Sequence, residues 1–555
     1  MALALGGCYS GESASDAGES TSSSGADATS AAADETSAGD TADDDTGAPA
    51  KPFMPGPPVL PRLTQRQYLN SVEALLGPGL PVPPLEPDTN PYLFFTIGAA
   101  STTVSELGVQ QYEEAAELFT GIVFADVARR DALVGCLPAA PGDACVSEFI
   151  ARFGRRAYRR PLAADEQARW LTMATELANG DAWQGVRHAI AGMLQSPHFL
   201  YRVEASDIAE GTKIRLSGHE IASKLSYMLW NTMPDDELFA AAADGSLDDP
   251  KGVASQATRL LDHPRARDMV ANFHYQLLKV DHYSDIYKDP VKFAAYSAEV
   301  NPLLASETLK FVDDVIFNDG DFATLLTAPY TFVNAKLAPF YGVQGDFGDD
   351  FVKVDLDPAR RAGILTQLGF LMANAGAFEN DPIHRGVFMN LQLLCTGLPP
   401  PPNMVPPLPP PVEGETLRER VDRHTGKGTC GEGCHGYLIN PLGFAFEHYD
   451  PLGQWQTMDA GKPVDAAAEF QFGGVPQKYD GAVELAHLMA DSDEAHKCYV
   501  AHFLEYGYAR RPQKADQEFI DSLAAGSKDG THTIKQIILE LTRSDAFLNR
   551  APVEE

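Results

Sequence analysis

The stretch Thr64-Gln-Arg-Gln-Tyr-Leu-Asn-Ser-Val-Glu-Ala-Leu-Leu76 carries the pattern that decides the fold class of this chain. It opens with Thr64 and Gln67, whose three-residue spacing is that of a capping box at the start of a helix. Apolar side chains then recur at the helical period, at Tyr68, Leu69, Val72, Leu75 and Leu76. Gly77-Pro78 follows, and such a pair ends helices. The stretch therefore predicts one short amphipathic helix.

The same pattern recurs along most of the chain. Ser217-Gly-His-Glu220 is a second capping box, and it precedes apolar residues at a helical spacing. Further helical periods lie at about 146–158, 164–178, 183–196, 252–280, 303–317, 359–374, 383–395, 493–509, 514–525 and 532–545. Strand patterns are few, and the clearest is Ala468-Glu-Phe-Gln-Phe472. We therefore predict a mainly α, multi-domain fold with a helical body, a C-terminal helical module and little β structure.

The N-terminus resembles the end of a bacterial lipoprotein signal. Leu5-Gly-Gly-Cys8 has the small residues that precede a lipid-modified cysteine, although basic residues and a long apolar run are missing before it. We therefore expect the sequence to start inside a signal peptide. Residues 9–50 are rich in Ser, Ala, Gly, Asp and Thr, which suits a flexible tether behind an anchor at Cys8. The alternative is a disordered N-terminus in which Cys8 has no role.

The net charge of −34 bears on partners and location. Ten of the acidic residues lie between Cys8 and Ala50, where there is no Lys or Arg, but the rest of the chain is acidic as well. This charge argues against nucleic acid and anionic lipid as partners. No apolar run of about twenty residues predicts a membrane-spanning helix. Contact with a membrane is thus expected through the lipid anchor alone, at the bacterial cell envelope.

Two cysteines and a histidine form the one cluster that indicates a definite chemistry, Cys430-Gly-Glu-Gly-Cys434-His435. Two thiols followed by an imidazole can hold haem c, with two thioether bonds and His435 as the iron ligand. The common spacing has two residues between the cysteines, and this chain has three. A Cys430–Cys434 disulfide is the alternative, and zinc or another transition metal bound with His424 is a weaker one. For the sixth iron ligand we favour His424 over the alternatives Met458, His448, His487 and Met489.

The other cysteines suit an oxidising compartment, because six remain when Cys8 is set aside. Cys136 and Cys145 flank a short loop rich in Pro and Gly, so we predict a disulfide between them. If Cys430 and Cys434 hold haem, Cys395 and Cys498 remain as a second pair.

Several stretches resemble, in order, the planctomycete-type cytochrome-like multi-domain proteins of unknown function. They are Ser196-Pro-His-Phe-Leu-Tyr-Arg202, Leu225-Ser-Tyr-Met-Leu-Trp230, Tyr330-Thr-Phe-Val-Asn334, Arg361-Ala-Gly-Ile-Leu-Thr366, Pro382-Ile-His-Arg-Gly386 and the run from Cys434 through Asn440-Pro-Leu-Gly-Phe444 to Asp450-Pro-Leu-Gly453. The resemblance implies a secreted or surface protein whose C-terminal module is cytochrome-c-like. His424 resembles a histidine typical of the family. Asn440 stands where the family more often has Asp.

Proline-rich segments at 51–61, 78–91 and 398–411 mark boundaries in this long chain. The predicted units are a signal remnant at 1–7, an acidic tether at 8–55, helical modules at 56–135 and 136–205, a central helical domain at 206–345, a helical module at 346–398, a polyproline linker at 399–411 and the cytochrome-c-like module at 412–550.

Two hypotheses about function follow. The first is a cell-envelope lipoprotein with a c-type haem, which serves electron transfer or redox chemistry with a redox protein as partner. The second is a surface protein without haem that binds a polysaccharide or a secreted protein. No phosphate-binding loop, Gly-x-Ser-x-Gly elbow or His-Glu-x-x-His helix is present, so the sequence predicts no specific enzyme activity.

Overall fold

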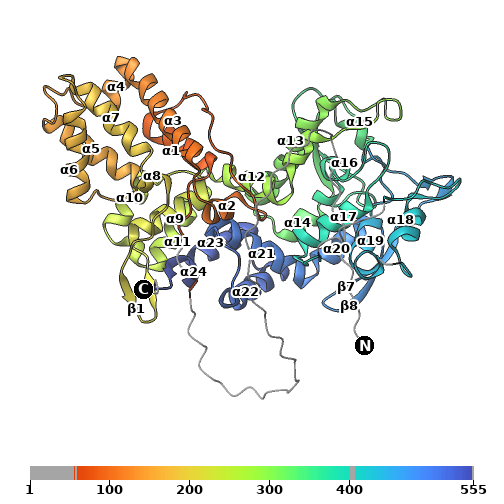
Figure 1. Cartoon of the computed structure of the whole chain (residues 1–555). Helices are drawn as coiled ribbons and strands as arrows, with labels where there is room; N and C mark the ends of the chain where they lie inside the picture. The colour runs from red at the N-terminus through yellow and green to blue at the C-terminus, as the bar shows by residue number, and fades with distance from the viewer. Residues whose placement is uncertain (1–54, 57–58, 400–406, 430, 553–555) are drawn as a thin grey trace, which may run out of the picture.

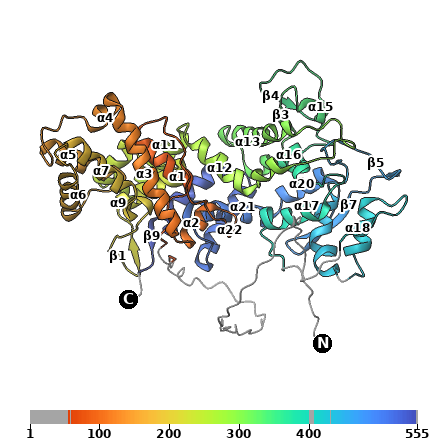
Figure 2. The same cartoon turned by 45° about the horizontal axis from the view of Figure 1, so that its top comes forward.

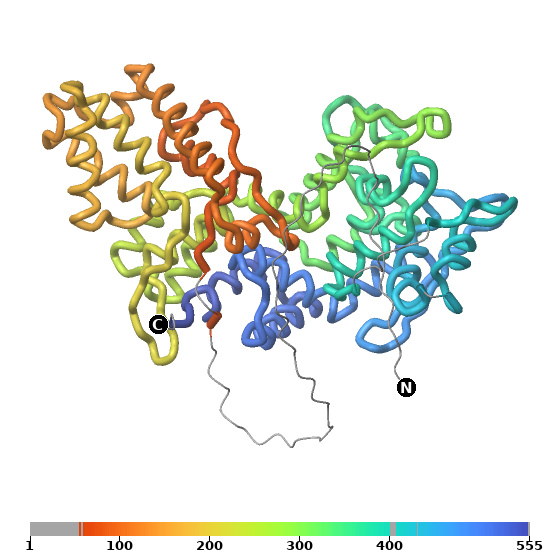
Figure 3. The backbone as a smooth tube through the Cα atoms, in the orientation of Figure 1, coloured from red at the N-terminus to blue at the C-terminus, as the bar shows by residue number. Residues whose placement is uncertain are grey.

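The computed structural model describes residues 55–56, 59–399, 407–429 and 431–552. In this part of the chain, one lobe of helices holds the N-terminal modules and a second lobe holds the middle of the chain (Figure 1). The C-terminal helices run beneath and between the two lobes (Figures 1 and 3). The predicted signal remnant at 1–7, Cys8 and nearly all of the tether at 8–55 lie outside the described residues, as do Cys430 and most of the polyproline linker.

The prediction of a mainly α fold is confirmed. The N-terminal lobe contains α1 (Gln65–Leu76), α2 (Phe95–Ser101), α3 (Glu106–Ala125), α4 (Val127–Val134), α5 (Ala144–Ala157), α6 (Ala164–Glu176), α7 (Ala182–Leu194) and α8 (Pro197–Leu200). The chain continues through α9 (Gly218–Trp230), α10 (Asp236–Ala243), α11 (Pro250–Asp262), α12 (Ala266–Leu277), α13 (Asn301–Phe317), α14 (Phe322–Thr327), α15 (Ala338–Tyr341), α16 (Leu368–Ala373), α17 (Pro382–Phe388), α18 (Leu417–Thr425), α19 (Asn440–Phe444) and α20 (Ala482–Ala490). It ends with α21 (Asp493–Tyr508), α22 (Gln517–Lys528), α23 (Ile534–Arg543) and α24 (Asp545–Leu548). Among the described residues, no helix is both long and apolar enough to cross a membrane.

Short helices of other windings connect these elements. The 3₁₀ turns are η1 (Ser246–Asp248), η2 (Val280–Asp285), η3 (Ala298–Val300), η4 (Ile364–Thr366) and η7 (Lys514–Asp516). Two π-helices, η5 (Met389–Leu393) and η6 (Glu432–Ile439), lie near the predicted cytochrome-c-like module.

The β structure of the described residues is limited to small antiparallel sheets. They pair β1 (Ile208–Glu210), β2 (Lys213–Arg215) and β9 (Asn549–Arg550), then β3 (Tyr330–Val333) with β4 (Val352–Asp355), β5 (Met458–Asp459) with β6 (Lys462–Pro463), and β7 (Ala467–Phe472) with β8 (Val475–Asp480). The strand predicted at 468–472 is confirmed within β7. Pairing of β2 with β9, at Ile214 with Arg550, ties the end of the described chain to its middle.

Both predicted capping boxes form. The Thr64 hydroxyl accepts a hydrogen bond from the Gln67 backbone N–H, and the Gln67 side chain accepts one from Thr64. Ser217 and Glu220 make the same reciprocal contacts at the start of α9. Each box satisfies backbone N–H groups that would otherwise lack partners, so both helices begin where the sequence predicts.

Two predicted helices differ from the structure. The stretch at 252–280 divides into α11 and α12 at Pro264, because proline cannot donate the backbone hydrogen bond that a continuous helix needs. The stretch at 359–374 is helical over α16 and in the short turn η4 only. Gly363 has a φ of +51° there, and a Cβ at this position would lie 2.2 Å from the Leu325 carbonyl oxygen. Close packing of Gly363 against α14 therefore interrupts the helix that the apolar spacing predicts.

Helix α21 lies at the centre of the molecule, with most of its side chains buried. Its Phe503 ring stacks on Phe273 of α12, with centroids 3.8 Å apart, and its Tyr499 ring stacks on Phe322 of α14 at 4.2 Å. The large apolar core around this helix runs from Phe94 to Leu548, whereas a separate smaller core holds α1 and α3–α8. The C-terminal helices lie against α2, α9 and α12 on one side and against α14 and α20 on the other (Figure 2).

Both predicted disulfides form, Cys136–Cys145 and Cys395–Cys498. The first closes the short loop before α5. The second joins the segment after η5 to α21 across 103 residues of sequence.

A fully buried carboxyl group, that of Glu307 on α13, lies in the second lobe. Its Oε1 accepts hydrogen bonds from the hydroxyls of Thr331 and Tyr341, and its Oε2 has no partner among the described residues. Burial raises the pKa of Glu307 to about 7 against the opposing effect of these hydrogen bonds.

We predict that stability falls between about pH 4.5 and pH 7, and that Glu307→Gln reduces this fall. Below the ordinary pKa of 4.5, folded and unfolded chains both hold the proton. Between 4.5 and about 7 only the unfolded chain releases it, so the free energy of unfolding decreases, by up to about 3 kcal/mol. Thermal unfolding across this range measures the effect, and Glu210→Gln, at an exposed position on β1, is the control. The same pH dependence in wild type and Glu307→Gln would contradict the prediction.

Candidate functional site

The candidate site lies in the segment α18–η6–α19, which carries the predicted haem ligands. Helix α18 starts with a capping box between Thr416 and Glu419 and places His424 in its last turn. Gly426 ends the helix, and Gly428, with a φ of +86°, turns the chain back. These turns bring η6 alongside α18.

The π-winding of η6 suits the unusual spacing of the cysteines. A π-helix arises where one additional residue is accommodated within a helix, and such segments are frequent at functional sites. This chain has one residue more than the common two between Cys430 and Cys434. The segment from Glu432 to Ile439 is wound as a π-helix and continues directly into α19 at Asn440. Glu432 and Gly433, two of the three residues between the cysteines, lie in this wider helix.

Two glycines let the backbone of α17 lie directly against η6 and α19. A Cβ at Gly386 would lie 2.0 Å from the Ile439 carbonyl oxygen, and a Cβ at Gly443 would lie 1.8 Å from the Pro382 carbonyl oxygen. Neither position can therefore carry a side chain without separating the two segments. Nearby, the buried Arg385 side chain donates to the Phe446 carbonyl and fixes the same contact.

Three histidines line one cavity of about 210 Å³ between α17, α18 and η6: His384, His424 and His435. His435 is 5% exposed, and its Nδ1 has no hydrogen-bond partner among the described residues. Burial lowers the pKa of His435, and the charge of His424 lowers it further, although the Asn440 side chain acts in the opposite direction. The imidazole of His435 is therefore held neutral, which is the form that ligates iron.

The structure brings the predicted residues His424 and His435 together and adds His384, which the sequence analysis did not single out as a ligand. His384 bonds to Asp381 through Nδ1, and this hydrogen bond raises the pKa of His384. His384 stands in Pro382-Ile-His-Arg-Gly386, one of the stretches that carry the family resemblance, so this motif could have indicated it as a site residue.

The other candidate sixth ligands lie away from this cavity. His448 stacks on Trp455, and its Nδ1 lies 3.0 Å from the Gln456 carbonyl oxygen. Met458 is exposed on β5, His487 is exposed on α20, and Met489 is buried in the large core. The apolar walls of the cavity are Ile383, Leu408, Leu417 and Val421.

Cys434 is 6% exposed and packs against Ile439 and α17. It is disulfide-bonded. Its thiol is thus in the oxidised state. Among the described residues of this cavity, no three His, Cys, Asp or Glu side chains converge on one point. The predicted zinc alternative also uses Cys430, which lies outside the described residues.

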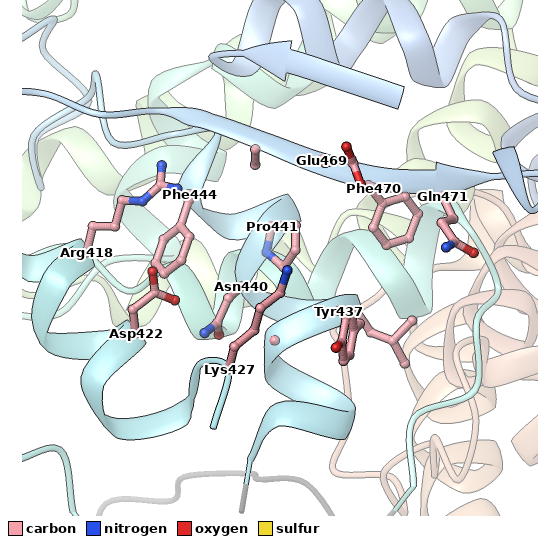
Figure 4. A pocket seen from close by; sticks show the side chains of 13 residues that line it. Arg418, Asp422, Lys427, Tyr437, Asn440, Pro441, Phe444, Glu469, Phe470 and Gln471 are labelled. Carbon is pink, nitrogen blue, oxygen red and sulfur yellow. The ribbon is translucent and has the colours of Figure 1, made fainter. Parts of the chain in front are cut away.

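A larger cavity of about 690 Å³ lies between η6, α18 and β7 (Figure 4). Its wall combines the aromatic rings of Tyr437, Phe444 and Phe470 with charged and amide side chains of Arg418, Asp422, Lys427, Asn440, Glu469 and Gln471. The Arg418 guanidinium lies over the Phe444 ring at 4.7 Å, and the Lys427 ammonium lies 5.5 Å from the Tyr437 ring. Tyr437 is 53% exposed, so its ring is available to a ligand.

Glu447 lies between two smaller cavities beside α18. It is 3% exposed, and its Oε1 has no partner among the described residues. Burial raises the pKa of Glu447 to about 7, while Arg385 opposes the shift.

Comparisons with known proteins match family models along most of the chain. Each is described as a protein of unknown function: DUF1587 over residues 62–124, DUF1595 over 145–204, DUF1592 over 216–343, DUF1588 (PSCyt3) over 361–459 and DUF1585 over 476–547. The histidine-lined cavity and Cys434 fall within the DUF1588 match, and α21 falls within the DUF1585 match. No curated protein and no solved structure matches the chain. With these modules in this order, the chain belongs to the planctomycete cytochrome-like multi-domain proteins of unknown function.

Proposed function

We propose that the segment α18–η6–α19 attaches a c-type haem and gives the protein a role in electron transfer or extracytoplasmic redox chemistry. The observation that carries this proposal is the buried His435, whose Nδ1 has no partner among the described residues and which shares a cavity with His424. A buried polar atom without a partner is costly unless it binds a ligand or water. Two further points support haem as this ligand: the chain belongs to a cytochrome-like family, and Cys430, Cys434 and His435 form a cluster that can attach haem c.

The residues around the cavity fit such a group in their chemistry. Once reduced, Cys430 and Cys434 would supply the thioether sulfurs, and His435 and His424 would supply nitrogen ligands to the iron. A haem held in this way exchanges single electrons. At about 210 Å³ the cavity is smaller than the roughly 300–1,000 Å³ of ordinary ligand pockets. Pro407 and Leu408, which lie within the predicted polyproline linker, form one wall of the cavity.

The haem prediction is tested on protein made in a host with cytochrome-c maturation. We expect a Soret band and a haem-stained band on a denaturing gel, because thioether bonds survive unfolding. His424→Ala is expected to shift the visible spectrum towards a five-coordinate iron. His487→Gln, at an exposed histidine outside the cavity, is the control. Absence of covalent haem from the matured wild-type protein would overturn the proposal.

We further propose that Cys8 anchors the protein to the bacterial cell envelope. The support is the sequence Leu5-Gly-Gly-Cys8 and the composition of residues 9–50, which suits a flexible tether. A diacylated cysteine provides the two chains that stable anchoring requires.

Metabolic labelling tests the anchor. Radiolabelled palmitate is expected to enter the protein expressed from its complete gene and to be lost in Cys8→Ser, with the protein moving from the membrane to the soluble fraction. Ser10 lies two residues further along the tether and has no thiol to acylate, so Ser10→Ala serves as a control that keeps the label. Equal labelling of wild type and Cys8→Ser would rule out this anchor.

A second candidate function is binding of a neutral oligosaccharide in the 690 Å³ cavity. Exposed aromatic rings stack on sugar faces, and the surrounding amide and charged groups can bond to hydroxyls. Positive and negative side chains both line the wall, which favours a neutral ligand. The disulfide-bonded state of Cys434 agrees with this function.

Binding is tested with an array of neutral oligosaccharides, followed by calorimetry on the best ligand. Tyr437→Ala is expected to weaken binding about ten-fold, because one stacked ring contributes about 1.4 kcal/mol. Tyr287→Ala removes a ring that is 61% exposed outside the cavity and should leave the affinity unchanged. No binding on the array, or equal affinity of Tyr437→Ala and wild type, would contradict this function.

A further inference from the structure

The disulfide Cys395–Cys498 has an imidazole directly beside it. Nε2 of His502 lies 3.3 Å from the Cys498 sulfur and 3.5 Å from the Cys395 sulfur. Cys498 and His502 are four residues apart on α21, so they occupy the same face of the helix. The imidazole therefore faces both sulfurs of the bond.

Glu505 fixes the orientation of this imidazole. Its Oε2 lies 2.8 Å from Nδ1 of His502, and because a carboxylate oxygen accepts, Nδ1 carries the hydrogen. The ring also packs edge-on against Phe94. His502 and Glu505 are 5% and 7% exposed, so this pair is held in a dry environment. A hydrogen on Nε2 would point at the two sulfurs.

The two sulfurs differ in access. Cys498 is 2% exposed, whereas Cys395 is exposed at the surface. Cys395 also has a φ of +50°, the left-handed region that residues with a Cβ rarely adopt. An approaching thiol would thus reach Cys395 first and leave Cys498 next to the imidazole.

The other disulfide of the described chain lacks this arrangement. The Cys136 sulfur lies near the backbone carbonyls of Val134 and Cys145, at 3.8 and 3.6 Å. Carbonyl oxygens do not stabilise a thiolate. Cys136–Cys145 therefore serves as an internal reference in the same molecule.

We propose that Cys395–Cys498 is a thiol–disulfide exchange site for a dithiol, with His502 as the group that stabilises the leaving thiolate and Glu505 as its positioning residue. The site is independent of haem attachment. It follows the arrangement of an activated cysteine, in which a base lies next to the sulfur and a third group orients the base.

The exchange balances as follows. A thiolate of the dithiol attacks the Cys395 sulfur, a new S–S bond forms, and the Cys395–Cys498 bond breaks with its electron pair going to Cys498. Nε2 of His502, which has taken the proton released by the attacking thiol, donates it in a hydrogen bond to this thiolate. The second thiolate of the dithiol then attacks its own sulfur in the mixed disulfide and releases Cys395. The dithiol loses two electrons and two protons, and the Cys395/Cys498 pair gains them.

The test uses the full chain with dithiothreitol as the dithiol, at pH 7. Samples are quenched with acid and alkylated, and mass spectrometry follows each cysteine pair separately. We expect Cys395–Cys498 to be reduced at least about ten-fold faster than Cys136–Cys145. In His502→Gln the rate at Cys395–Cys498 should fall about ten-fold while that at Cys136–Cys145 stays the same. Glu505→Gln should give an intermediate rate.

If His502→Gln merely loosened the fold, reduction of Cys395–Cys498 would become faster rather than slower, because an opened structure exposes a buried disulfide. A faster reaction at Cys395–Cys498 in His502→Gln would therefore overturn the proposal. Equal rates for the two disulfides of the wild type, or an unchanged rate in His502→Gln, would do so as well.

Discussion

Phe503 of α21 stacks on Phe273 of α12, and this contact lies where the two lobes meet the C-terminal helices. Both rings are almost completely buried, so their separation would expose a large apolar area at the centre of the molecule. Helix α21 makes further contacts on both sides: Tyr506 donates to Asn272, and Tyr499 stacks on Phe322. The position of α21 also determines where Cys498 and His502 lie. The large apolar core and the proposed exchange site thus both depend on one buried helix, whereas α1 and α3–α8 have a core of their own.

A second constraint, backbone contact at two glycines, creates the histidine-lined cavity. Gly386 and Gly443 let α17 touch η6 and α19 without intervening side chains. This close approach places His384 beside His435, although 51 residues separate them in sequence. The motifs Pro382-Ile-His-Arg-Gly386 and Asn440-Pro-Leu-Gly-Phe444 are therefore two halves of one contact, which gives a physical reason for the presence of a glycine in each.

Local patterns were sufficient to predict much of the fold. The capping boxes at Thr64 and Ser217 and the strand β7 are local features, and the structure has them where they were predicted. Helix α3 runs for 20 residues without a clear helical period, because Leu107 and Val109 lie on its exposed face and blur the pattern. The break around Gly363 depends on contact with a distant segment, so no local pattern could reveal it. The motif that carries His384 is visible in the sequence, but the cavity that His384 shares with His424 and His435 depends on the packing of α17. The disulfides were predictable because the chain has few cysteines to pair. The position of the His502 imidazole next to Cys498 could not be predicted, because it depends on how α21 packs against the segment that carries Cys395.

The central functional claim is that Cys430, Cys434 and His435 hold haem, and one peptide decides it most directly. Trypsin cuts after Lys427, so the peptide that begins at Gly428 contains all three residues. Mass spectrometry of this peptide, from protein matured by the cytochrome-c system and not treated with a reductant, measures the state of both sulfurs. We predict that the mass of this peptide is increased by one haem bound through both cysteines. A peptide without added mass that still contains a Cys430–Cys434 disulfide would contradict it.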